Sequence, residues 1–488
     1  MNNKTRRTSI VATLGPATDA PGMLENILRE GVAVVRLNLS HGKPEDHLRR
    51  AREAHAAAAN LNREVGVLAD LQGPKIRIEN FATGPVQLEP DADFTLDCRA
   101  EAPPGDATRV GVSYLGLPQD MKEGDRLLLD DGLVELEVKN IEGDQIHCRV
   151  AVGGKLSDRK GLNRKGGGLS LGALSDKDRA DIKLAAQLRA DFLAVSFVRS
   201  AADIEEARKL LREAGGNAWL VAKIERAEAI EKLEEIIDAS DAVMVARGDL
   251  GVEIGDAELP GLQKKIIRES LARNRAVITA TQMLQSMVES PIPTRAEVLD
   301  VANAVLDGSD AVMLSQESAA GKYPLKAVEA MVRICIGAEK QFEANTNFEQ
   351  AQRDLQHTDQ AIAMATMFLS EHIGVRAIVA MTESGGTARH LSRFRSNVPI
   401  FGLSRHVGAR RRMALMRDVF PIDFDSRGLA TREAAREALK QLYDHALLAE
   451  GDRVIITSGD HMEQHGATNT LRLLQVGTAG KAEGLGEL

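Results

Sequence analysis

A lysine and two carboxylates form the most reactive group of side chains in the sequence. Lys223 and Glu225 stand two residues apart at the end of the apolar run "AWLVAKIER", and Asp249 follows the next such run, "DAVMVARGDLG". Because alternate residues of an extended strand face the same side, Lys223 and Glu225 should point together. Two oxygen donors without a nearby histidine or cysteine suit Mg²⁺ or Mn²⁺ rather than zinc. The alternative is a pair of solvated acids at strand ends.

Lys223 also needs an anionic partner, because a lysine at the end of an apolar strand must find a counter-charge or a substrate anion. It could stabilise a phosphoryl group during transfer. It could instead form a Schiff base with a keto acid, as in a barrel lyase or aldolase acting on pyruvate. The "RGDLG" turn places the amide of Gly248 beside Asp249. This turn suits a carboxylate or phosphate oxygen, or it is only a tight strand end.

The elements that must position these side chains are eight short, nearly all-apolar runs, each followed by an amphipathic helical stretch. Such runs are typical of parallel strands buried on both faces. Eight is the number of strands that closes a TIM (β/α)8 barrel, so we predict that fold. An open doubly wound sheet is the alternative. In a barrel, chemistry collects at the carboxyl ends of the strands. The polar residues there are Arg36, Asn38, Ser40, His41, Asp70, Ser196, Lys223, Glu225, Arg247, Gly248, Asp249, Thr281, Ser315 and Glu317.

The spacing of the runs also predicts the domain organisation. The third and fourth runs are separated by far more chain than a βα loop can absorb. Short alternating segments such as "GLVELEV" and "QIHCRV" occur there between Gly, Pro and Asp residues, which indicates a small antiparallel β domain. We predict a catalytic barrel over 1–71 and 169–345, an inserted small β-barrel lid domain over 72–168, and a C-terminal open-sheet α/β domain over 346–488.

The composition restricts the class of protein. The 488 residues carry a formal net charge of −9 and only 3% aromatic residues, whereas nucleic-acid binding needs a basic face and stacking aromatics. No apolar run approaches the roughly 20 residues that cross a bilayer. Three cysteines are too few for a disulfide framework or a zinc site. We therefore expect a cytoplasmic protein with a small anionic ligand and no nucleic-acid or membrane partner.

Five segments together resemble the motifs of pyruvate kinase, in order and at the family's spacing: "RLNLSHG", "GPKIR", "AKIER", "VMVARGDLGVE" and "TATQMLQSM". The resemblance extends over essentially the whole chain. It implies Mg²⁺-dependent transfer of the phosphoryl group of phosphoenolpyruvate to ADP, which gives pyruvate and ATP in the final step of glycolysis. On the family pattern, Lys223 would stabilise the transferring phosphoryl group, and Glu225 with Asp249 would hold the divalent metal.

The same resemblance implies the other binding roles. Arg36 would grip the phosphate, while the amides of Gly248 and Asp249 with Thr281 would hold the substrate carboxylate. Thr281 would also lie near the proton that is delivered to the enolate. The inserted domain would close over the nucleotide to exclude water. The positions that match the nucleotide site are Pro16, His41, Arg77 and Lys160.

Lys75 marks a subgroup of the family. Many members need K⁺ at positions that match Asn38, Ser40, Asp70 and the carbonyl of Leu71, and they have Glu where this chain has Lys75. The chain resembles the K⁺-independent subgroup, so K⁺ should not be required. We expect the Lys75 ammonium to pair with Asp70 and to supply the charge of the ion, with a Coulomb term on the order of 4 kcal/mol before desolvation. A solvated lysine at a domain junction is the alternative.

The C-terminal domain has its own predicted anion site. The segment "TESGGT" follows an apolar strand and precedes a helix, which places hydroxyls and glycine amides at a helix amino terminus. The resemblance implies a phosphorylated allosteric activator there and a homotetramer. Many arginines follow this segment, and a subunit interface is an equal explanation for most of them. A catalytically inactive sensor is a rival function, although it would not need the intact catalytic set. The predicted effector residues are Thr382, Glu383, Ser384, Gly385, Gly386 and Thr387.

Overall fold

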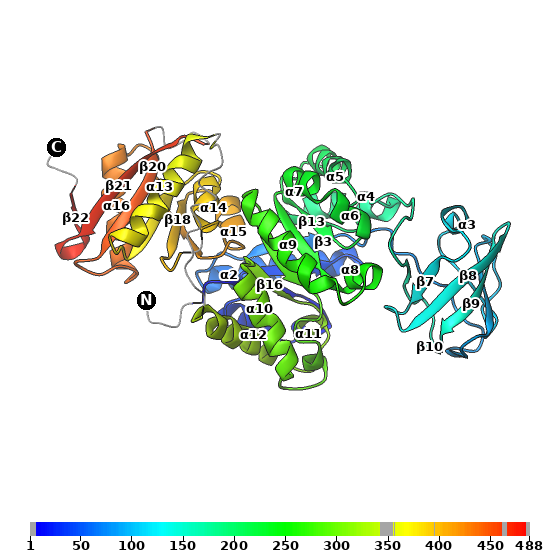
Figure 1. The fold of residues 1–488 in the computed structure, drawn as a ribbon. Coiled ribbons are helices and arrows are strands. Elements are labelled where there is room, and N and C mark those ends of the chain that lie inside the picture. The colour runs from blue at the N-terminus through cyan, green and yellow to red at the C-terminus, as the bar shows by residue number, and fades with distance from the viewer. Residues whose placement is uncertain (1–5, 342–354, 356, 395, 461–465, 485–488) are drawn as a thin grey trace.

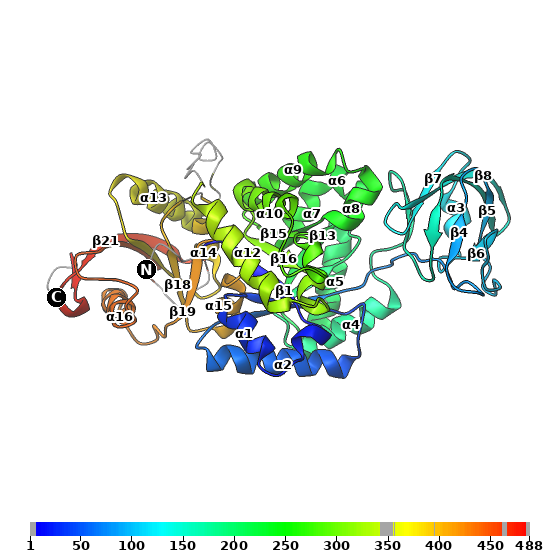
Figure 2. The same ribbon diagram turned by 90° about the horizontal axis from the view of Figure 1, so that it is seen from below.

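The computed structural model describes residues 6–341, 355, 357–394, 396–460 and 466–484. Figures 1 and 2 show three bodies in a row, with the barrel between the inserted β domain and the C-terminal α/β domain. The predicted boundary between residues 345 and 346 lies outside the described residues. None of the described helices combines the length and the apolar character that a membrane-spanning helix requires.

The central body is a closed parallel barrel of eight strands in the order β1-β16-β15-β14-β13-β12-β3-β2. This confirms the predicted barrel and excludes the open sheet. Each predicted apolar run contributes one strand because both of its faces are buried. The strands are β1 (Ser9–Thr13), β2 (Val34–Asn38), β3 (Gly66–Asp70), β12 (Phe192–Val195), β13 (Trp219–Ile224), β14 (Ala242–Ala246), β15 (Ala276–Ala280) and β16 (Ala311–Leu314).

Helices surround the barrel and cover the outward faces of its strands (Figure 2). They are α1 (Met23–Arg29), α2 (Pro44–Asn60), α4 (Asp176–Gln187), α5 (Ala201–Glu213), α6 (Ala227–Glu231), α7 (Leu233–Ala239), α8 (Arg247–Ile254), α9 (Leu259–Ala272), α10 (Arg295–Asp307), α11 (Gln316–Ala319) and α12 (Pro324–Glu339). Two short 3₁₀ turns, η1 (Pro16–Thr18) and η2 (Gln285–Val288), lie in loops that follow strands.

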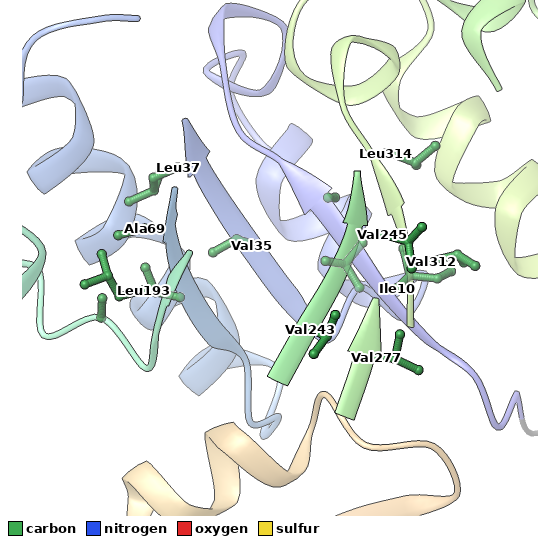
Figure 3. Packing of buried hydrophobic residues seen from close by; sticks show 14 of the residues in the cluster. Ile10, Val35, Leu37, Ala69, Leu193, Val243, Val245, Val277, Val312 and Leu314 are labelled. Atoms are coloured by element: carbon green, nitrogen blue, oxygen red, sulfur yellow. The ribbon is translucent and has the colours of Figure 1, made fainter. Parts of the chain in front are cut away.

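Alternate residues of each strand enter two different cores. Val11, Val34 and Leu68 belong to the cluster inside the barrel. Their neighbours, such as Ile10 and Val35, belong to the large cluster between the strands and the helices. Figure 3 labels ten side chains of this second cluster on the barrel strands. Full burial of one such aliphatic side chain contributes about 1.5–3 kcal/mol, so the two cores hold the strand ends in fixed positions.

The inserted body is built almost entirely from antiparallel strands. They pair as a six-stranded sheet in the order β11-β7-β8-β9-β5-β6 and a two-stranded sheet β10-β4, which enclose one apolar core. The β5–β6 pair is parallel, which the alternating pattern did not predict. The elements are β4 (Val86–Leu88), β5 (Asp93–Asp97), β6 (Arg109–Gly111), α3 (Leu117–Asp120), β7 (Arg126–Leu129), β8 (Val134–Glu142), β9 (Gln145–Val152), β10 (Gly154–Leu156) and β11 (Leu162–Arg164).

The C-terminal body is an open α/β sheet in the order β19-β18-β17-β20-β21-β22, as predicted. Its first four strands are parallel, and β21 and β22 add an antiparallel edge. The elements are α13 (Thr358–His372), β17 (Ala377–Met381), α14 (Gly386–Ser392), β18 (Ile400–Ser404), α15 (Val407–Met413), β19 (Val419–Asp423), α16 (Thr431–Asp444), β20 (Arg453–Gly459), β21 (Thr468–Val476), η4 (Thr478–Gly480) and β22 (Ala482–Glu483).

The C-terminal body packs against the amino ends of the barrel strands. Leu415, which follows α15, joins the cluster inside the barrel. The backbone of Asp418 donates a hydrogen bond to the carbonyl of Arg7, two residues before β1. The inserted body follows β3 and therefore leaves from the opposite, carboxyl end. The carboxyl end is consequently the rim where the predicted site residues meet.

Candidate active site

Lys223 is the centre of the polar cluster at the carboxyl end of the barrel. Its Nζ lies 2.6 Å from Ser196 Oγ, 2.9 Å from Glu225 Oε1 and 3.3 Å from Asp70 Oδ1. Burial by itself would lower the pKa of Lys223, but the carboxylates of Asp70 and Glu225 outweigh burial and raise that pKa. A Schiff-base lysine needs a neutral amine and hence a lowered pKa. The surroundings of Lys223 therefore favour a permanent cation over a covalent nucleophile.

Arg36 is fixed beside Lys223 by a shared carboxylate. Its Nε donates to Asp70 Oδ2 at 2.6 Å, and its Nη1 donates to Thr13 Oγ1 at 3.0 Å. Burial would raise the pKa of Asp70, yet Lys223 and Arg36 hold that pKa below its usual range. Asp70 is thus an ionised buried group that orients two cations toward the same rim. Sequence reasoning missed Thr13, although its place at the end of β1 is a usable signal.

Glu225 and Asp249 are the two acids predicted to hold a divalent metal. Glu225 Oε2 accepts a hydrogen bond from the backbone of Phe197 at 2.8 Å, and Asp249 lies in the first turn of α8. Burial raises the pKa of Glu225, and the nearby charge of Asp249 adds to this effect. A bound divalent cation would favour the ionised form of Glu225.

The donor set limits which metal fits these two acids. Among the described residues no group of three or more His, Cys, Asp or Glu side chains is arranged to hold an ion. A site with only two acids suits Mg²⁺, which usually keeps water and substrate phosphate oxygens as its other ligands. Zinc, which takes most of its ligands from the protein, fits poorly.

Thr281 is held close to Gly248 in an unusual backbone conformation. The amide of Gly248 donates to Thr281 Oγ1 at 2.9 Å, and this hydroxyl donates to the carbonyl of Ala280 at 2.7 Å. Thr281 has φ of 67°, which is rare for a β-branched residue and tends to occur at functional sites. Buried Arg247 stabilises this turn because its guanidinium donates to the carbonyls of Thr281 at 2.6 Å and Ala280 at 3.2 Å. Arg247 is therefore a supporting residue, a role that its place in the "RGDLG" motif does not predict.

The predicted pair between Lys75 and Asp70 is wrong. Lys75 Nζ instead lies 2.8 Å from Asp249 Oδ1. Both carboxylate oxygens of Asp70 already face other cations. The Lys75 side chain runs past Gly161, where an added Cβ would lie 3.0 Å from Lys75 Cε. The ammonium of Lys75 is thus paired with Asp249, one of the two predicted metal-binding acids.

The residues that match the K⁺ site lie on neighbouring strands. Asn38 at the end of β2 is in register with Asp70 at the end of β3. Asn38 Oδ1 accepts from the backbone of Ser40 at 3.2 Å, and the carbonyl of Leu71 accepts from Ser196 Oγ at 2.7 Å. These oxygens and the carboxylate of Asp70 form a polar rim beside Lys223.

The four predicted nucleotide residues lie on two different bodies. Pro16 begins η1 and His41 is exposed after β2, so both are on barrel loops. Arg77 forms a β-bridge with Gly161, which brings it next to Lys160 on the paired segments that enter and leave the inserted body. Lys160 Nζ lies 2.8 Å from an oxygen of Asp130 within that body.

The predicted effector segment lines a cavity of about 180 Å³ in the C-terminal body. Gly385 is not in the lining, but its φ of 89° shapes the turn before α14. Glu383 brings a carboxylate into the site and accepts hydrogen bonds from Arg405 at 3.1 and 3.2 Å, with His406 also in contact. The lining includes Thr382, Glu383, Ser384, Gly386, Thr387, Arg389 and Arg405.

Comparisons with known proteins agree on one family. The family model described as "Pyruvate kinase, barrel domain" matches residues 5–328, and "Pyruvate kinase, alpha/beta domain" matches residues 360–474. "Pyruvate kinase II" of Salmonella typhimurium is 52% identical over 480 residues, which cover 98% of this chain and 100% of that protein. A pyruvate kinase of Haemophilus influenzae is 49% identical over 476 residues, covering 96% and 98%. One of Mycobacterium tuberculosis is 40% identical over 478 residues, covering 97% and 99%.

Proposed function

Because the chain belongs to the pyruvate kinase family and is a phosphotransferase of that family, we propose that the cluster around Lys223 performs its chemistry. The reaction is Mg²⁺-dependent transfer of the phosphoryl group of phosphoenolpyruvate to ADP, which gives pyruvate and ATP. The observation that carries this proposal is a buried lysine kept cationic by Asp70 and Glu225 beside Arg36. Phosphoryl transfer needs such positioned cations more than it needs a nucleophile.

Each polar group at the rim has a place in this reaction. Arg36 binds the phosphate of phosphoenolpyruvate, and Lys223 stabilises the charge on the phosphoryl group as it moves toward ADP. Glu225 and Asp249 would hold Mg²⁺ or Mn²⁺, which supplies charge neutralisation at the phosphate oxygens.

The second half of the reaction is the protonation of the enolate. The amides of Gly248 and Asp249 with the Thr281 hydroxyl bind the substrate carboxylate, and this places the enolate carbon near Thr281. The hydroxyl already takes part in a chain of hydrogen bonds from Gly248 to Ala280. Through a bound water it delivers the proton that completes pyruvate.

ADP binds between the barrel and the inserted body in this proposal. Pro16 and His41 contact it from the barrel, and Arg77 and Lys160 contact it from the inserted body. Both cations belong to paired segments that join the two bodies, so one movement of the inserted body would carry both toward the phosphates.

Pyruvate formation tests the reaction directly. The purified protein should make pyruvate and ATP from phosphoenolpyruvate and ADP only when Mg²⁺ or Mn²⁺ is present. Borohydride treatment in the presence of pyruvate should leave the mass of the protein unchanged, because Lys223 forms no Schiff base. A borohydride-trapped adduct on Lys223 without metal-dependent ATP formation would instead support the lyase.

We further propose that the enzyme does not require K⁺. Lys75 supplies a tethered positive charge at the rim through its contact with Asp249. The pair is partly exposed, with side chains 24% and 22% accessible, so solvent screens the interaction and its contribution is modest.

Regulation and assembly complete the proposal. A phosphorylated activator binds the C-terminal cavity, where hydroxyls of Thr382, Ser384 and Thr387 and nearby arginines converge. A homotetramer would cover the apolar side chains of Ile292 and Leu299, which are 68% and 62% exposed beside and on α10. Three buried, unpaired cysteines are consistent with a cytoplasmic location.

A further inference from the structure

Trp219 is the only tryptophan of the chain and begins β13. The same strand carries Lys223 near its other end, and Glu225 follows it directly. Trp219 packs both against the cluster inside the barrel and against a cluster of the C-terminal body. Its ring also makes an edge contact with Phe192, with centroids 6.2 Å apart. Trp219 therefore joins the amino end of the active-site strand to the C-terminal body.

Two arginines from the C-terminal body lie over the Trp219 ring. Arg389 of α14 and Arg412 of α15 each place the guanidinium carbon 5.6 Å from the ring centroid. The Nε atoms of both are buried without a hydrogen-bond partner in the part of the chain that the structure describes. Burial, helped by Arg275 and Arg393, lowers the pKa of Arg389 to about 10. Arg389 is thus a cation whose charge is incompletely neutralised.

The two arginines differ in one respect. Arg389 also lines the C-terminal cavity, one turn into α14, whereas Arg412 does not. A phosphate in that cavity would offer Arg389 a charged partner in place of an aromatic face. Charge-assisted hydrogen bonds to phosphate are among the strongest that a guanidinium makes. Arg412 has no such choice, and this makes it a matched control.

We propose that Arg389 is a positioning residue that couples the C-terminal cavity to the active-site strand through Trp219. With the cavity empty, Arg389 lies over Trp219 and holds the amino end of β13. With a phosphorylated ligand bound, Arg389 turns to the phosphate, and β13 adjusts the position of Lys223 and Glu225. This inference rests on the proposed activation through the C-terminal cavity. Coupling of this kind is reciprocal, so a ligand at the active site must also change the surroundings of Trp219.

Intrinsic fluorescence of the full-length protein tests the coupling, because all tryptophan emission comes from Trp219. Glucose 6-phosphate, fructose 1,6-bisphosphate and inorganic phosphate serve as probes of the cavity. Phosphoenolpyruvate with Mg²⁺, without ADP, serves as the probe of the active site. A cavity probe that activates the enzyme should shift the emission and lower the phosphoenolpyruvate concentration for half-maximal rate several-fold. Phosphoenolpyruvate with Mg²⁺ should shift the emission as well.

Two substitutions separate coupling from packing. In Arg389→Gln, a cavity probe should no longer change either the emission or the half-saturating phosphoenolpyruvate concentration. Arg389→Lys, which keeps the charge, should restore part of both responses. Arg412→Gln removes the other cation from the same ring and should keep both responses.

The outcomes distinguish this inference from the proposed activation. An activating probe that leaves the wild-type emission unchanged, or that still activates Arg389→Gln, overturns the coupling and leaves the activation intact. If no cavity probe activates the enzyme, the proposed activation fails. In that case the active-site probe alone tests the coupling along β13 between Trp219 and Lys223, and an emission that phosphoenolpyruvate with Mg²⁺ does not shift overturns it.

Discussion

The two ends of the barrel both bury charged side chains, but they use them differently. At the amino end, Arg393 pairs with both oxygens of Asp310 and also donates to the carbonyl of Arg275 at 2.6 Å. Asp310 in turn accepts from the backbone amides of Val277 and Arg417, each at 2.9 Å. At the carboxyl end, burial and the charge of Asp249 raise the pKa of Glu225, although Lys223 lies 2.9 Å from that acid and opposes the shift.

This difference shows that a buried ion pair is not by itself a sign of function. The Arg393–Asp310 pair is saturated by hydrogen bonds within the protein, which is the arrangement that makes a buried pair tolerable. In the Lys223 cluster the charges are not closed off in this way, because Glu225 lies near enough to the like charge of Asp249 for its pKa to be raised. Chemistry is expected where the charges remain unbalanced.

The largest effect should come from the unbalanced end. Lys223→Met should lower kcat/KM for phosphoenolpyruvate on the order of 10³-fold, about 4 kcal/mol, because the fixed charge at the transferring group is lost. Coupled measurement of pyruvate formation gives this value, and the exposed α5 variant Lys209→Met serves as the control. A loss of less than tenfold would show that Lys223 does not act on the transition state.

At the amino end, loss of the Arg393–Asp310 pair should lower the free energy of unfolding rather than the activity. Arg393→Met leaves Asp310 buried without its cation, which costs about 3–5 kcal/mol. Chemical denaturation should show this loss of stability. The folded fraction of the variant should keep its kcat/KM, because its active-site residues remain in place. Lys440→Met, which breaks an exposed pair with Asp444 in the same body, should leave the unfolding transition unchanged. An Arg393→Met protein as stable as the wild type would contradict the structural role of this pair.

A pH dependence of stability should arise at the amino end. Burial raises the pKa of Asp191 to about 6, although Arg411, Arg412 and the amide of Val67 oppose the shift. Because the folded pKa lies above the unfolded value, the native state holds this proton more tightly. The contribution of Asp191 to stability must therefore fall as pH rises from about 4 to about 6, by at most about 2–3 kcal/mol.

Asp191→Asn tests this contribution while it keeps the oxygen that accepts from Val67 at 2.9 Å. The variant should be more stable than the wild type at pH 7.5 and nearly equal to it at pH 4. Urea unfolding at the two pH values measures the difference. An equal stability change at both values would mean that Asp191 does not titrate in this range.

The sequence predicted the carboxyl end better than the contacts between bodies. Lys223, Glu225 and Asp249 could be identified because they follow apolar runs whose alternation and parallel arrangement bring strand ends together. The partner of Lys75 could not, since it depends on the path of a segment between two bodies. The partner of Glu383 could not be predicted either, because its pairing with Arg405 joins two different loops within the C-terminal body. Trp219 had no signal in the sequence because its arginine contacts come from helices far along the chain.

The smallest expected effect concerns Lys75. Its ammonium adds positive charge beside Asp249 at the carboxyl end, but the pair remains partly exposed to solvent. The wild type should show little difference in rate between K⁺ and tetramethylammonium buffers. Lys75→Glu should lose about tenfold in tetramethylammonium, near 1.4 kcal/mol, because a new carboxylate then stands beside Asp249. K⁺ should restore most of that loss.

Lys75→Met separates the missing cation from the added acid. It removes the ammonium that lies 2.8 Å from Asp249 but brings no ligand for an ion, so K⁺ should restore it less than it restores Lys75→Glu. Equal rescue of both variants would mean that the ion binds at Asn38, Ser40 and Asp70 regardless of the residue at position 75. A strong K⁺ requirement in the unmodified enzyme would show that the ammonium, held by Asp249 rather than by Asp70, does not replace the ion.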